Sequence, residues 1–132
     1  MVIDMNLNDK NNCINHKTKN VFESFKYAFT GIFTAIKNER NMRIHLFAMI
    51  LVIVFGLIFG LEVFEWIVCI VLFGGVLAGE MINTAIENAV DMVSMEKNDK
   101  AKIAKDVAAG AELVWAICSA IIGALIFIPK IF

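Results

Sequence analysis

Long apolar blocks separated by charged stretches make up most of the chain after residue 43. The segments 44–61, 66–79 and 113–129 contain no Asp, Glu, Lys or Arg. Each approaches the roughly 20 residues that a helix needs to cross a bilayer core of about 30 Å. Pro129 is expected to end the last helix, because proline lacks a backbone donor. With flanking residues included, the pattern predicts three transmembrane helices, at about 43–60, 65–91 and 102–128.

A different pattern precedes these blocks. Apolar side chains in residues 21–38 recur at the spacing of one helical face, while lysines and threonines fall largely elsewhere on the wheel. This predicts an amphipathic helix lying in the membrane interface, although packing against the bundle would give the same pattern. Residues 1–19 are rich in Asn and Lys and are interpreted as a flexible polar tail before a membrane domain of residues 20–132. The apolar face comprises Phe22, Phe25, Phe29, Ile32, Phe33 and Ile36.

Composition and charge placement support an all-α membrane protein. The 132 residues suffice for one domain, 59% are hydrophobic, and the mean hydropathy is +0.72. Seven of the lysines and arginines lie in the first 43 residues and four more in residues 91–106. Because cytoplasmic loops carry the excess of Lys and Arg, the N-terminus and the 91–106 connection are predicted to be cytoplasmic, with the C-terminus outside the cell membrane. No nucleic-acid partner is expected.

The most informative polar residues form a stripe on the second predicted membrane helix. At 100° per residue its five members fall within about 100° of the helix wheel. A carboxylate at the centre of a membrane helix costs roughly 2.5–3.5 kcal/mol on insertion scales, so this face needs a compensating cation or a function. Polar contacts that only join helices are the alternative interpretation. The stripe consists of Glu80, Asn83, Thr84, Glu87 and Asp91.

Depth along the helix separates two carboxylates. Glu80 lies about 23 Å from Glu65 at the outer surface, which places it in the inner leaflet, where a lipid head group presents its hydroxyl. Glu87 lies roughly 10 Å nearer the cytoplasm. Glu80 could therefore act as a general base on a lipid alcohol while Glu87 meets a nucleotide and its metal.

Further residues at the same depth suit phosphoryl transfer. Glu39 and Glu87 offer the hard oxygen ligands that Mg²⁺ prefers, and Lys105 offers a cation for phosphates. His45 is expected to face the interface rather than to act as a ligand, and Trp66 to anchor the outer surface. An ion pathway and a non-catalytic membrane adaptor remain alternatives, although the outer half of the bundle offers no ionisable relay on the first membrane helix. Gly56 with Gly60 and Gly75 with Gly79 form two GxxxG pairs, a spacing that is consistent with oligomerisation in a membrane.

Several segments resemble a known family. Residues 80–87 (EMINTAIE), followed by Asp91, by 104–106 (AKD) and by 108–111 (AAGA), resemble the prokaryotic integral-membrane diacylglycerol kinases. The segments 24–28 (SFKYA), 38–41 (NERN) and 127–130 (FIPK) look like its undecaprenol kinase branch. The resemblance covers about residues 20–132.

The resemblance implies a lipid kinase that moves the γ-phosphate of MgATP to a membrane lipid alcohol. Undecaprenol is the expected acceptor and diacylglycerol the alternative. It further implies a homotrimer in the lipid bilayer, with active sites between subunits. Glu80 would be the proton acceptor, and Glu39 and Glu87 the ligands of Mg²⁺. The nucleotide would be bound by Tyr27, Glu39, Asn83, Glu87, Glu96, Asn98, Lys105 and Asp106.

Overall fold

The protein is described by a computed structural model that covers residues 20–94, 96 and 98–132, so the predicted tail at 1–19 lies outside the described residues. The described residues are almost entirely helical, and α3, α4 and α5 are each long and apolar enough to cross a membrane. The prediction of an all-α protein with three such helices is therefore confirmed. The helices are α2 (Val21–Asn38), α3 (Arg40–Phe59), α4 (Val63–Val93) and α5 (Asp99–Ile131).

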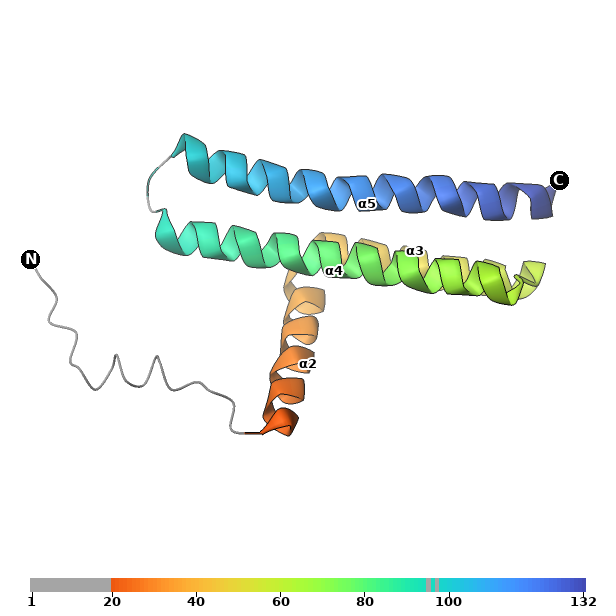
Figure 1. Cartoon of the computed structure of the whole chain (residues 1–132), viewed down its shortest axis with the longest axis horizontal. Coiled ribbons are helices and arrows are strands. Elements are labelled where there is room, and N and C mark those ends of the chain that lie inside the picture. The colour runs from red at the N-terminus through yellow and green to blue at the C-terminus, as the bar shows by residue number, and fades with distance from the viewer. Residues whose placement is uncertain (1–19, 95, 97) are drawn as a thin grey trace, which may run out of the picture. The chain divides into compact units, whose positions relative to one another are not determined.

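Helices α3, α4 and α5 run alongside one another, and α4 packs against both of its neighbours (Figure 1). A tight turn at Gly60 joins α3 to α4, and the φ of 65° at this residue suits glycine, which has no Cβ. The start of α4 and the end of α5 meet at one end of the bundle. There the Lys130 ammonium lies 3.0 Å from Oε2 of Glu65, which also accepts a 2.8 Å hydrogen bond from the Glu62 amide.

The membrane helices are longer than the apolar blocks indicated, and the expectation for Pro129 is wrong. Helix α5 begins at Asp99 and continues through Pro129 to Ile131. Proline removes one backbone donor, but the next amides still find acceptors, as the Phe132 amide does on the Ile128 carbonyl at 3.3 Å. An apolar block ends at the first charged residue. The helix itself continues further, because backbone hydrogen bonding does not depend on side-chain charge.

Glycines allow large side chains to pack between the helices. A Cβ on Gly56 of α3 would lie 2.8 Å from the Trp66 ring of α4, and a Cβ on Gly75 of α4 would lie 2.5 Å from the Trp115 ring of α5. These two members of the GxxxG pairs are therefore used within the chain. Small residues have the same role between membrane helices generally, because they allow close approach.

Candidate active site

Glu80 is the most deeply buried charged residue that the structure describes. Only 2% of its surface is exposed, and Asn83, one turn further along α4, is 8% exposed. Within the described part of the chain, neither Oε2 of Glu80 nor Oδ1 of Asn83 has a hydrogen-bond partner. Buried polar atoms are normally paired, so each of these two oxygens is an acceptor that a ligand or a neighbouring chain could use.

His45 and Glu112 meet beside Glu80. Nε2 of His45 on α3 lies 2.8 Å from Oε1 of Glu112 on α5, and both side chains are largely shielded. One ligand atom each from His45, Glu80 and Glu112 lie within 4.8 Å of one another. The expectation that His45 faces the interface is therefore wrong. Its partner is on another helix, 67 positions away, which no local spacing indicates.

Two more carboxylates interact electrostatically with Glu80. Glu39 and Glu87, together with Glu112 and His45, all contribute to its electrostatic environment. With Glu80 itself, these residues comprise four carboxyl groups and one imidazole, so acidic side chains outnumber basic ones around this site. A divalent cation would offset this excess, and carboxylate oxygens are the ligands that hard cations prefer.

Antiparallel packing accounts for the approach of Glu39. Because Gly56 faces Trp66, moving 17 residues back along α3 and 17 forward along α4 brings Glu39 level with Asn83. Glu39 immediately precedes α3 and is partly exposed, as is Glu87. The Glu87 carboxylate lies 3.5 Å from the Asn83 amide nitrogen. Glu39 and Glu87 therefore lie within electrostatic range of Glu80. The described group whose ligand atoms lie close enough to share one ion consists instead of His45, Glu80 and Glu112.

A second group of predicted residues lines a cavity between the end of α4 and the start of α5. The cavity has a volume of about 460 Å³, and Glu96, Asn98 and Lys105 lie in its wall with Asp91. The Lys105 ammonium contacts both carboxylate oxygens of Asp91, at 2.9 and 3.1 Å. The Asn98 side chain accepts a 2.9 Å bond from the Lys100 amide and so caps α5.

The two remaining predicted residues are exposed. Asp106 lies on α5 next to Lys105, and Tyr27 lies on α2 with 54% of its surface exposed. No described contact assigns either of them to the cluster or to the cavity. Their roles stay predictions.

Sequence reasoning missed the pairing of His45 with Glu112. From the sequence, Glu112 could be paired inside the bundle or lie near the lipid, and nothing in the pattern names His45 as its partner. Its separation from Lys105, about two helical turns, was the available signal that it lies deeper in the bundle.

These features define a multi-pass membrane protein with a carboxylate-rich site inside its helical bundle. The profile of the prokaryotic diacylglycerol kinase family matches residues 26–127, and the chain belongs to this family. The undecaprenol kinase of Bacillus subtilis is 43% identical over 110 residues, which cover 83% of this chain and 89% of that protein.

Two other relatives carry a different name. A diacylglycerol kinase of Synechocystis is 38% identical over 113 residues, 85% of this chain and 65% of that protein. A diacylglycerol kinase of Sinorhizobium is 31% identical over 110 residues, 83% of this chain and 80% of that protein. The protein is therefore an ATP-dependent lipid kinase, a transferase that uses ATP as co-substrate.

Proposed function

We propose that the protein phosphorylates undecaprenol to undecaprenyl phosphate. The undecaprenol kinase of Bacillus subtilis has 43% sequence identity to this chain over most of both proteins. This identity carries the proposal. Diacylglycerol is the second candidate, because the two relatives at 38% and 31% identity are named for it. Both acceptors present a primary hydroxyl at the membrane surface, so the site residues alone do not choose between them.

Glu80 is the proposed general base. The acceptor oxygen attacks the γ-phosphorus in line, the bond from that phosphorus to the bridging oxygen breaks, and ADP leaves. The hydroxyl proton passes to the Glu80 carboxylate. The unpartnered Oε2 of this buried side chain supports the role, since an acceptor hydroxyl could donate to it directly.

Glu39 and Glu87 are the proposed ligands of Mg²⁺. They fit this ion because both are partly exposed carboxylates that approach the same buried residue in a cluster where acidic side chains outnumber basic ones. Bound Mg²⁺ would neutralise charge on the phosphates during transfer. Asn83, beside Glu87, would orient the nucleotide at this boundary.

The cavity beside Asp91 is the proposed site of the rest of the nucleotide. Lys105 lies there as a cation for the phosphates, with Glu96 and Asn98 in the same wall. Asp91, 2.9 Å from the Lys105 ammonium, would orient this cation in the cavity for an incoming nucleotide. Asp106 and Tyr27 are proposed to complete the nucleotide site.

The proposed assembly is a homotrimer with active sites shared between subunits. Helix α2 would lie in the membrane interface with its Phe side toward the lipid. The N-terminus and the α4–α5 connection would face the cytoplasm, as the distribution of Lys and Arg indicates.

Parallel assays of the two lipids test the acceptor. Purified protein in mixed micelles is supplied with radiolabelled ATP, Mg²⁺ and either undecaprenol or diacylglycerol at equal mole fraction. A kcat/KM at least about tenfold higher for undecaprenol is expected, which corresponds to about 1.4 kcal/mol of discrimination. Faster labelling of diacylglycerol would reject undecaprenol as the substrate.

A further inference from the structure

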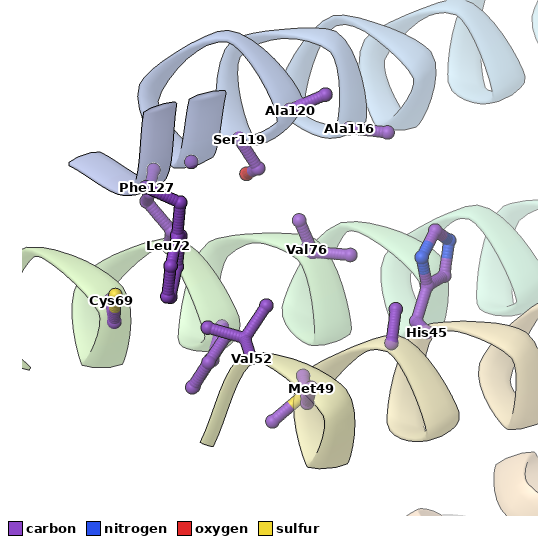
Figure 2. A pocket seen from close by; sticks show the side chains of 13 residues that line it. His45, Met49, Val52, Cys69, Leu72, Val76, Ala116, Ser119, Ala120 and Phe127 are labelled. Carbon is purple, nitrogen blue, oxygen red and sulfur yellow. The ribbon is translucent and has the colours of Figure 1, made fainter. Parts of the chain in front are cut away.

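Three groups that can bind a metal meet inside the bundle, one from each membrane helix. Among the residues that the structure describes, they form the one group whose ligand atoms all lie within 4.8 Å of one another: His45 of α3, Glu80 of α4 and Glu112 of α5. Figure 2 shows the His45 ring extending from α3 into the space between α4 and α5. A single chain therefore brings together one nitrogen ligand and two carboxylates.

The spacing of these atoms is close to that of a coordination shell. Zinc binds imidazole nitrogen at about 2.0–2.1 Å and carboxylate oxygen at about 2.0–2.2 Å, so neighbouring ligands of a tetrahedral ion lie about 3.4 Å apart. Nε2 of His45 and Oε1 of Glu112 are 2.8 Å apart and would separate by about half an ångström around such an ion. Small rotations of the two side chains provide a movement of this size.

Glu80 supplies the observation that points to a ligand here. Its side chain is 2% exposed, and its Oε2 has no hydrogen-bond partner among the described residues. His45 and Glu112 bond to each other, so their contact leaves this oxygen unsatisfied. Buried polar atoms are normally paired, and an ion held by the three side chains gives the Glu80 carboxylate the partner that it lacks.

Charge balance favours a divalent ion. Histidine binds metals through its neutral imidazole, so the ligand set contributes the charges of two carboxylates. One divalent ion brings the whole group to zero net charge. Unpaired charges inside a membrane helix are costly, and the bound ion would offset this cost at Glu80 and Glu112 together.

The ligand types favour a transition metal over magnesium. Mg²⁺ prefers oxygen ligands in octahedral geometry and retains several waters, whereas imidazole nitrogen suits Zn²⁺. Three protein ligands with water in the fourth position are typical of an open zinc site. The cavity that His45 lines has a volume of about 220 Å³, which leaves room for that water, since one water occupies about 30 Å³.

The group is separate from the proposed ligands of Mg²⁺. Glu39 precedes His45 by six residues, about 9 Å at the rise of a helix. Glu87 follows Glu80 by seven residues, about 10 Å along α4. Both carboxylates are partly exposed and interact electrostatically with Glu80, so they provide a cation with a route from the surface to the buried group.

We propose that His45, Glu80 and Glu112 form a second metal site, which binds one Zn²⁺ per chain. Zn²⁺ at this site would occupy the Glu80 carboxylate, which could then no longer accept the proton of the lipid hydroxyl. This inhibition rests on the proposed function, because it takes Glu80 to be the general base. The binding of Zn²⁺ does not depend on that role.

Calorimetric titration of the purified full-length chain in detergent tests the site directly. In the presence of excess Mg²⁺, one Zn²⁺ should bind per chain. His45→Gln and Glu112→Gln each remove one ligand and keep a polar side chain, and each should weaken Zn²⁺ binding at least about tenfold. His16→Gln is the matched control, because it removes the other histidine of the chain and should leave the affinity unchanged.

X-ray absorption at the zinc edge identifies the ligands. Nitrogen and oxygen neighbours are expected at about 2.0–2.2 Å, with the imidazole signature lost in His45→Gln and kept in His16→Gln. Sulfur neighbours at about 2.3 Å would place the ion on cysteines and overturn the proposal. Zn²⁺ binding that survives both His45→Gln and Glu112→Gln, or that excess Mg²⁺ abolishes, would also overturn it. Helical circular dichroism checks the fold of both variants, and either one that folds is sufficient for the test.

Kinase assays separate the metal site from the proposed function. Zn²⁺ should inhibit undecaprenol phosphorylation at saturating Mg²⁺. The Zn²⁺ concentration that halves the rate should rise at least about tenfold in His45→Gln and in Glu112→Gln, each measured against its own rate without zinc. Zn²⁺ binding at the site without inhibition would keep the metal site and reject Glu80 as the base. An active kinase that binds no Zn²⁺ would reject the metal site and leave the proposed function intact.

Discussion

Nε2 of His45 lies 2.8 Å from Oε1 of Glu112, and this contact joins α3 to α5 within the helical bundle. The two side chains are 21% and 13% exposed, so water can shield their interaction only in part. Both residues also lie within 4.8 Å of Glu80 through their ligand atoms. The pair therefore lies directly beside Glu80 of α4.

Breaking the pair on one side should destabilise the protein. Glu112→Leu leaves the imidazole without its acceptor and should lower the free energy of unfolding by about 1–3 kcal/mol. Replacing both partners with leucine should recover most of that loss, because no polar group is then left unpaired. Unfolding in detergent, followed by helical circular dichroism, measures both variants. A double variant less stable than the single one would contradict this account.

Glu80→Gln should abolish turnover while the fold persists. Glutamine has nearly the same shape but cannot take the hydroxyl proton, so kcat is expected to fall by about 10²–10⁴-fold. Lipid phosphorylation with radiolabelled ATP measures the rate, and size-exclusion chromatography checks the assembly. Glu23→Gln, which removes an exposed carboxylate in the first turn of α2, is the control. Normal turnover by Glu80→Gln would remove Glu80 from the base role.

Hydropathy predicted the three long helices because each must present apolar side chains over the thickness of a membrane. It could not predict their ends. Asp99 begins α5 and Ile131 ends it, although both lie outside the apolar block, since helical hydrogen bonding does not depend on side-chain charge. Pro129 failed as a stop signal for a different reason, because one missing backbone donor near the end of a helix is tolerated.

The site was predictable where its residues share one helix. Glu80, Asn83 and Glu87 fall on one face by periodicity alone, and the structure keeps them together. The pairing of His45 with Glu112 depends instead on how α3 and α5 are placed around α4. That placement is determined by packing between residues far apart in the chain, which a periodic pattern does not contain.

Glu87→Gln should raise the Mg²⁺ concentration that gives half-maximal activity. Replacing a charged ligand with a neutral amide weakens binding of a hard cation, and we expect a shift of about tenfold or more. Titration of Mg²⁺ at saturating ATP and lipid measures it. Glu39→Gln should behave alike if both carboxylates bind the same ion. An unchanged requirement in both variants would rule out this ligand pair.

Lys105→Met should raise the KM for ATP without destabilising the bundle. The ion pair of Lys105 with Asp91 is partly exposed, with 35% and 64% of the two side chains accessible, so its loss should cost less than about 1 kcal/mol. Asp91→Asn removes the same ion pair and keeps the lysine, which makes it the matched control. A KM for ATP raised equally by the two variants would show that the pair, rather than the cation, matters.

Gly75→Ala should destabilise the packing of α4 on α5. The added Cβ would lie 2.5 Å from Cζ3 and 2.6 Å from Cε3 of Trp115, so the ring must move or the helices must separate. Overpacking of this kind costs typically about 1–3 kcal/mol, whereas Gly74→Ala, with no neighbour within 4 Å, should gain up to about 1 kcal/mol from helix propensity. Detergent unfolding of the two variants side by side measures the difference.

Adding Trp115→Leu to Gly75→Ala should restore part of the stability, because the smaller side chain makes room for the methyl group. If Gly75→Ala were as stable as Gly74→Ala, the close approach of the two helices at this point would be refuted.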